Sequence, residues 1–133
     1  MIAGKTAIVT GGGTGIGRAI AEVFAAAGAE VVVAGRSPDT IGAAAAAIGG
    51  RAFVCDVTKL DDVEALFAEA ARLIGRVDIL VNNAGVSGPI APVTEVDLDA
   101  WRACVDINLM GALHCLRVAA RVMGAQRGGS IIN

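Results

Sequence analysis

A glycine-rich stretch near the N-terminus constrains the fold more than any other part of the chain. It runs from Thr10 to Gly17, between the β-branched run Thr6–Val9 and an alanine-rich helical pattern from Ile16 to Ala27. A glycine turn between a buried strand and a helix lets the backbone approach a ligand closely. It also directs the free N–H groups of the first helical turn at one point, which favours a pyrophosphate. The residues expected to bind a cofactor here are Gly11, Gly12, Gly13, Thr14, Gly15, Ile16 and Gly17.

The glycine spacing leaves a second interpretation open. Gly11, Gly15 and Gly17 do not follow the G-x-G-x-x-G pattern of the best-known dinucleotide fold, so a loose glycine-rich turn is the alternative.

Short apolar runs and helical patterns alternate along the rest of the chain, which is typical of an α/β protein with a parallel sheet. The strands expected after Thr6–Thr10 cover 30–34, 51–55, 77–81 and 130–133, and the helices begin near 16, 38, 58–61 and 94–97. We therefore expect a Rossmann-like, doubly wound parallel sheet in one dinucleotide-binding domain over residues 1–133, truncated at about the fifth strand.

Composition narrows the classes of function. The 133 residues are 55% hydrophobic, enough for a sizeable core, and a net charge of −2 without a basic run argues against nucleic acid or an anionic membrane surface. No apolar run is expected to reach the length of a membrane span. Three dispersed cysteines without a C-x-x-C pair favour the cytoplasm and no metal site. Small molecules are the expected partners.

The end of the second expected strand bears on the choice of cofactor. An acidic residue there bonds the adenosine ribose, whereas a basic residue accommodates a 2′-phosphate. This chain has Gly35-Arg36-Ser37 and no carboxylate, which favours NADP(H) over NAD(H); a solvated loop arginine is the alternative.

Polar residues also follow the third and fourth strands. Asp56, before Val57, accepts from an adenine amino group or caps the next helix. The run Asn82-Asn83-Ala84-Gly85 offers amides to a ribose or to neighbouring backbone, and its small residues leave room for a flat ligand.

The long helix expected from 94–97 to about 126 carries an apolar face that suits the core or a subunit interface. Its residues are Leu109, Leu113, Leu116, Ala120 and Met123. The single histidine, His114, lies on this helix without metal-ligand spacing and receives no role.

Together these motifs resemble the short-chain dehydrogenase/reductase family. The resemblance rests on the Thr10–Gly17 turn, Asp56-Val57, Asn82–Gly85, Asn108 in its Asp-Ile-Asn-Leu setting and the closing 128–133 segment. It implies a seven-stranded sheet of which this chain reaches the fifth strand. It also implies that the glycine turn binds pyrophosphate, Asp56 and Val57 hold adenine, and Asn83 to Gly85 lie beside the ribose.

The family's chemistry uses a catalytic Asn-Ser-Tyr-Lys set. By resemblance Asn108 belongs to that set, kinks its helix and holds a water in a proton relay. The chain has no tyrosine, so we expect it to be inactive alone. The full-length form is expected to be a homo-oligomer that transfers hydride between NADP(H) and an alcohol or carbonyl. The alternatives are a non-catalytic dinucleotide-binding or sensor module, and a chain that does not fold usefully alone.

Overall fold

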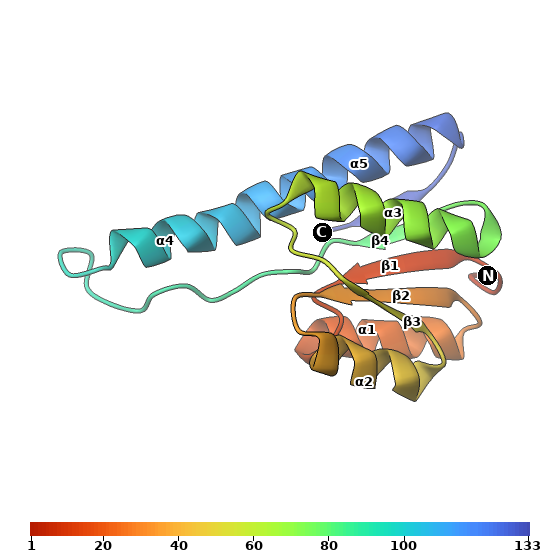
Figure 1. The fold of residues 1–133 in the computed structure, drawn as a ribbon, viewed down its shortest axis with the longest axis horizontal. Coiled ribbons are helices and arrows are strands. Elements are labelled where there is room, and N and C mark those ends of the chain that lie inside the picture. The colour runs from red at the N-terminus through yellow and green to blue at the C-terminus, as the bar shows by residue number, and fades with distance from the viewer.

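The computed structural model describes residues 1–133, except the side chain of Ile74, and contains a five-stranded parallel sheet (Figure 1). The strand order is β3-β2-β1-β4-β5, with β1 hydrogen-bonded to both β2 and β4. This order confirms the predicted Rossmann-like sheet. The strand bounds are Thr6–Thr10 for β1, Glu30–Gly35 for β2, Arg51–Val54 for β3, Ile79–Val81 for β4 and Ser130–Ile132 for β5.

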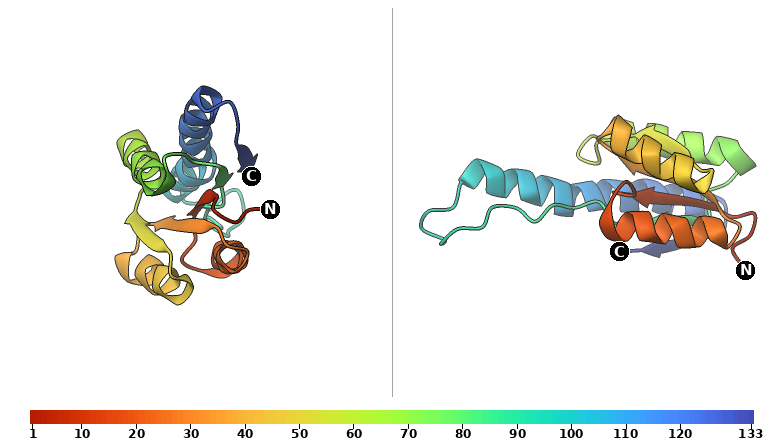
Figure 2. Two further views of the ribbon diagram at one scale, coloured as in Figure 1. Left: turned by 90° about the vertical axis from the view of Figure 1, so that its right-hand side faces the viewer. Right: turned by 90° about the horizontal axis from the view of Figure 1, so that it is seen from below.

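Helices cover both faces of the sheet, as a doubly wound fold requires (Figure 2). On one face α1 and α2 pack against β1, β2 and β3, and on the other α3 packs against β1, β2 and α5. Glycines in the left-handed conformation end α2 at Gly49 and α3 at Gly75, where a side chain would strain the backbone. The helix bounds are Gly15–Ala26 for α1, Pro38–Ile48 for α2, Leu60–Ile74 for α3, Leu98–Val105 for α4 and Ala112–Ala125 for α5.

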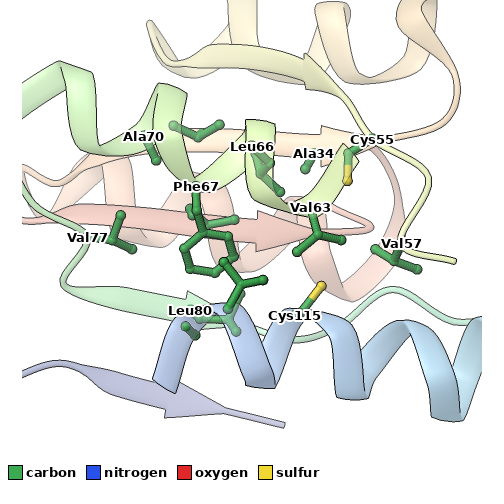
Figure 3. Packing of buried hydrophobic residues seen from close by; sticks show 14 of the residues in the cluster. Ala34, Cys55, Val57, Val63, Leu66, Phe67, Ala70, Val77, Leu80 and Cys115 are labelled. Carbon is green, nitrogen blue, oxygen red and sulfur yellow. The ribbon is translucent and has the colours of Figure 1, made fainter. Parts of the chain in front are cut away.

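The two layers bury side chains of different sizes. The layer under α1 and α2 combines small residues such as Ala21, Ala44 and Ala45 with valines of the sheet. The layer under α3 and α5 contains bulkier residues, with Phe67 and Leu80 fully buried near Cys115 (Figure 3). Both layers meet the central strand β1, whose five residues are all buried. The sheet therefore holds the end of β1 firmly, and the glycine turn starts from that end.

A π-helical turn, η1 (Asp106–Gly111), joins α4 and α5 into one continuous helix. The α4 part projects away from the sheet beside the 82–97 segment, and none of its residues is buried (Figures 1 and 2). The predicted apolar face is wrong as a core face, because Leu109, Leu113, Leu116 and Ala120 are exposed. The residues of α5 that enter the core are Cys115, Val118, Ala119 and Met123.

The expectation about membrane-span length also differs from the structure. By length and composition alone, the helix over Leu98–Ala125 is long and apolar enough to cross a membrane, with a mean hydropathy of 1.3 over its most apolar window. The sequence analysis predicts this long helix but no uninterrupted apolar run, because Arg102, Asp106 and Arg117 interrupt its apolar residues. Helices that pack one face on a protein core share this composition, as α5 does here.

Candidate cofactor site

The candidate site lies at the carboxyl ends of the strands, where β1 separates β2 and β3 from β4 and β5. The connections from β1 and β4 leave the sheet there to opposite sides, which opens a crevice in folds of this type. The glycine turn, Arg36, Asp56-Val57 and Asn82–Gly85 each follow a strand at this edge, and Asn108 lies on η1.

The glycine turn is shaped by backbone requirements. Gly11 and Gly15 have φ of +63° and +54°, in the left-handed region that a side chain disfavours. A Cβ on Gly17 would overlap the carbonyl oxygen of Gly11 and the side-chain nitrogen of Asn83, so α1 approaches the turn as closely as glycine allows. Thr14 is the N-cap of α1 but makes no side-chain capping bond. The first amides of α1 are left without helical acceptors, which is the arrangement that binds anions.

Thr10 connects the glycine turn to the end of β4. Its buried hydroxyl oxygen accepts from the backbone N–H groups of Asn83 and Ala84, each at 3.0 Å, and donates to the carbonyl of Val81 at 3.3 Å. The Asn83 amide in turn donates to the carbonyls of Thr10 at 3.1 Å and Gly11 at 3.3 Å. These bonds fix the glycine turn against the 82–85 segment.

The Asn82 amide is likewise engaged with protein atoms. It donates to the carbonyl of Ala112 at 2.9 Å and to the side-chain oxygen of Asn133 at 3.0 Å. Of the two interpretations of the adjacent amides, the structure shows bonds to neighbouring backbone. The members of the run that line a cleft are Ala84 and Gly85.

This first cleft, of about 110 Å³, collects residues from four separate connections. One wall comes from the ends of β2 and β3, and the other from the 84–86 segment and η1. It brings together six of the predicted cofactor residues: Gly11, Arg36, Asp56, Val57, Ala84 and Gly85. The sequence did not indicate its other lining residues, which are Ala34, Gly35, Val86 and Ile107.

Asp56 organises the turn before α3 while it lines the cleft. Its Oδ1 accepts from the backbone N–H of Thr58 at 3.0 Å and from the Thr58 hydroxyl at 2.7 Å. The Thr58 hydroxyl bond, helped by Lys59 and Arg36 nearby, lowers the pKa of Asp56 although partial burial opposes the shift. Lys59 rather than Asp56 is the N-cap of α3, so Asp56 caps a turn and not the helix itself.

A second cleft, of about 280 Å³, opens beside the first and shares Gly11, Gly35 and Arg36 with it. The start of α2 completes this cleft with two hydroxyl groups, those of Ser37 and Thr40, whose oxygens lie 2.9 Å apart. Gly13 and Thr14 also line it. A cation and two hydroxyl groups at a helix start are donors that suit an anion.

Asn108 lies on the π turn and binds the backbone of one residue in both directions. Its Oδ1 accepts from the N–H of Val86 and its Nδ2 donates to the carbonyl of Val86, both at 2.7 Å. The same oxygen would lie 3.0 Å from a Cβ on Gly85, so glycine is needed for this close approach. Asn108 thus fixes the segment that forms one wall of the first cleft.

The remaining predicted residues support the site without lining either cleft. Gly12 is buried and donates its N–H to the carbonyl of Ala34 at 3.3 Å, and the side chain of Ile16 is exposed on α1. Sequence reasoning named Thr10 as part of the glycine-turn motif without a role of its own, and it gave His114 no role. For the Thr10 hydroxyl, only its place before Gly11 could have indicated a role. His114 donates from Nδ1 to the carbonyl of Val57 at 2.8 Å.

Two of the three cysteines, Cys55 and Cys115, are buried. Burial raises the pKa of the Cys55 thiol to about 12 and that of Cys115 to about 11, so both stay protonated and unreactive near neutral pH. Among the residues that the structure describes, no group of three His, Cys, Asp or Glu side chains is placed to hold a metal ion.

Comparison with known proteins agrees with this geometry. The family model for short chain dehydrogenase matches residues 5–133. The chain is 42% identical to 2,5-dichloro-2,5-cyclohexadiene-1,4-diol dehydrogenase of Sphingobium indicum, covering 99% of this chain and 54% of that protein. It is 41% identical to cis-4-hydroxycyclohexanecarboxylate dehydrogenase of Sinomonas cyclohexanicum, over 97% and 53%.

Solved structures give the same result. A short-chain type dehydrogenase/reductase from Mycobacterium ulcerans superposes with a TM-score of 0.94 at 38% identity, covering 98% of this chain and 50% of that one. A xylitol dehydrogenase with bound NAD+ superposes with a TM-score of 0.92 at 33% identity, over 98% and 52%. The chain spans about half the length of the curated relatives it matches. On these matches and on its parallel sheet, this chain belongs to the short chain dehydrogenase family.

Proposed function

We propose that this chain is the cofactor-binding half of an oxidoreductase that transfers hydride between NADP(H) and an alcohol or a carbonyl compound. One observation carries the proposal: the first cleft joins the glycine turn, the end of β2, the Asp56-Val57 turn and the Ala84–Val86 segment in a single site. This is the place where doubly wound folds bind dinucleotides. The family membership makes NAD(P) the cofactor class.

The residues present fit such a cofactor. The close approach of Gly17 to Gly11 leaves no side chain over the free amides of α1, which would hold the pyrophosphate. Val57 and Ile107 give the first cleft apolar walls for adenine, and Asp56 provides a carboxylate at its edge. We place the nearer ribose beside Ala84 and Gly85, with Asn82 and Asn83 acting through the backbone that they hold. When bound, the nicotinamide supplies the hydride chemistry.

The preference for NADP(H) rests on the second cleft. Arg36, Ser37 and Thr40 present a guanidinium and two hydroxyl groups there, and no carboxylate lines this cleft. A 2′-phosphate gains from these donors, whereas the ribose hydroxyl of NAD(H) lacks the acidic acceptor that usually selects it. We therefore assign Arg36 the main part in cofactor selection.

Fluorescence titration with NADPH and NADH tests this assignment. In Arg36→Asp we expect the dissociation constant for NADPH to rise about tenfold or more, because a charge-assisted contact becomes a repulsive one. The affinity for NADH should hold or improve. Arg51→Asp makes the same charge change at the start of β3, away from the carboxyl edge, and should leave both affinities unchanged. Equal affinities in wild type and Arg36→Asp would contradict the preference.

Catalysis is proposed for the full-length product of the coding sequence. Asn108 is the member of the family's catalytic set that this chain contains, and it is placed beside the first cleft through Val86. Oxidation of NADPH in the presence of a panel of carbonyl compounds, followed by absorbance, tests the activity. The second candidate is a non-catalytic dinucleotide-binding module, which would use the same two clefts. Binding of NADPH without turnover by the full-length product would support that module.

The exposed apolar side chains of the long helix favour a homo-oligomer. Leu98, Trp101, Leu109 and Leu113 are between about half and two thirds exposed, and leaving such side chains in water is unfavourable. Sedimentation of the full-length product should give more than one copy per particle, and a monomer at all concentrations would contradict it.

A further inference from the structure

We propose that His114 is a positioning residue for adenine, because it holds the carbonyl of Val57 and thereby fixes one wall of the first cleft. The proposal rests on the proposed function, since it concerns the affinity of that cleft for the adenine half of the cofactor. His114 has one described hydrogen bond, from Nδ1 to the Val57 oxygen at 2.8 Å. A carbonyl can only accept, so Nδ1 must carry the hydrogen in this arrangement.

Val57 lies where the chain needs an external support. It belongs to the five-residue connection between β3 and α3, whose internal bonds use the Asp56 carboxylate and carbonyl and the N–H groups of Thr58 and Lys59. The carbonyl of Val57 takes no part in these bonds and accepts instead from His114, 57 residues away in sequence. This connection forms part of the cleft, so its position affects the width of the cleft directly.

The side chain of Val57 is held by the same helix. A Cβ on Gly111 would overlap Cγ2 of Val57, so the valine is seated on the glycine as closely as packing permits. Gly111 and His114 are three residues apart and lie on one side of the helix. Val57 is thus fixed at two points, its side chain by packing on Gly111 and its carbonyl by a hydrogen bond from His114.

The opposite wall of the cleft is held by the same helical segment, residues 107–114. Asn108 bonds both backbone groups of Val86, and Ile107 lines the cleft itself. The segment 107–114 therefore holds the two walls at a set separation, with Asn108 on one side and His114 on the other. An adenine ring needs a slot of definite width, so loss of the His114 bond should weaken binding of adenine more than binding of the nicotinamide half.

Two substitutions separate the hydrogen bond from the bulk of the ring. His114→Asn places an amide N–H close to the position of the imidazole Nδ1–H and keeps a donor to Val57. His114→Leu keeps an apolar side chain of similar reach and removes the donor. His114→Gln, whose amide lies one bond further from the helix, replaces His114→Leu if the leucine variant does not fold.

The readouts are two separate calorimetric titrations of the full-length protein. One uses ADP, which carries the adenine, and the other uses nicotinamide mononucleotide, which carries the other half of the cofactor. We expect His114→Leu to weaken ADP binding about five- to tenfold, His114→Asn to stay within about twofold of wild type, and mononucleotide binding to be unchanged in both. A role in general stability would weaken both ligands alike and would not be rescued by asparagine.

The outcomes are distinguishable. A wild-type protein that binds no ADP overturns the proposed function and this inference with it. Wild-type binding with equal ADP affinity in His114→Leu overturns the inference alone, as does a loss in His114→Leu that is shared by the mononucleotide or by His114→Asn. Selective loss of ADP affinity in His114→Leu, restored in His114→Asn, supports it.

Discussion

The two sides of the candidate site are built in different ways. On the side of β1 and α1, the glycine turn depends on the absence of side chains, because Gly11 and Gly15 have positive φ and Gly17 touches backbone. On the side of β4 and η1, the same cleft depends on side chains that hold backbone, with Asn83 bonding the turn and Asn108 bonding Val86. The first side is sensitive to added atoms, and the second, apart from Gly85 and Gly111, is sensitive to removed ones.

Because of this difference, mutations on the two sides should destabilise the protein for different physical reasons. An added methyl group on the glycine side displaces backbone, which cannot relax into free space. A truncated side chain on the amide side leaves a bonded N–H or C=O without its partner, which costs free energy without any clash.

The largest effect is expected from Gly17→Ala. Its Cβ would overlap the Gly11 carbonyl and the Asn83 amide, so the turn must move, and we expect the free energy of unfolding to fall by about 3 kcal/mol. Urea denaturation measures this loss, and NADPH titration should show impaired binding at the same time.

Gly15→Ala is the matched control on the same turn. A Cβ on Gly15 meets no atom within 4 Å, so only its left-handed backbone is strained, at a cost of about 1 kcal/mol. Equal losses in the two variants would show that backbone conformation, and not close contact, limits the turn.

The next effect tests the hydrogen bonds between the two sides. Thr10→Val keeps the shape of a buried side chain but removes the acceptor of the Asn83 and Ala84 N–H groups. We expect the free energy of unfolding to fall by about 2 kcal/mol, as measured by urea denaturation.

Thr6 provides an internal control at the other end of β1. It is also fully buried, and its hydroxyl oxygen has no partner among the described residues. Thr6→Val should therefore leave stability unchanged or raise it slightly. If Thr6→Val were as destabilising as Thr10→Val, methyl packing rather than hydrogen bonding would govern the strand.

The smallest effect concerns acid. The Thr58 hydroxyl bond holds the pKa of Asp56 below its ordinary value, so the ionised carboxylate favours the folded state. Its contribution to stability is present above a pH of about 4 and is lost as the pH falls through the lowered pKa. Thermal melting between pH 7 and pH 3 should show this loss in wild type. In Asp56→Asn the melting temperature should fall less steeply at acid pH. An identical pH dependence in the variant and the wild type would contradict a contribution of Asp56 to stability.

The glycine side could be predicted from the sequence because its signal is local. Consecutive glycines between a β-branched run and an alanine-rich run indicate a strand, a turn and a helix without knowledge of any partner, and β1 and α1 fall within a residue of the predicted bounds. The parallel sheet follows from the same alternation of patterns.

The amide side could be predicted only in part. Asn82–Gly85 and Asn108 are identified by resemblance, but their partners, such as Val86 for Asn108, are set by tertiary packing. His114 and Val57 lie 57 residues apart, and nothing local to either residue signals their bond. Of the apolar face expected to suit the core or a subunit interface, Met123 is buried, whereas Leu109, Leu113, Leu116 and Ala120 are exposed; packing against β4 and α3 instead selects the face with Cys115 and Val118 as the core face.

The π turn at Asp106–Gly111 has a consequence for the phase of the long helix. A π turn holds about one residue more than the α-helical turn it replaces, and one residue corresponds to a rotation of about 100° about the axis. The side chains after the turn are therefore rotated about the helix axis relative to the positions that a continuous α-helix would give them. Deleting one residue of the turn would restore a regular α-helical phase and would rotate Trp101 about the helix axis relative to Cys115. The π turn therefore separates the orientation of the exposed α4 from that of α5, whose residues Cys115, Val118, Ala119 and Met123 are buried.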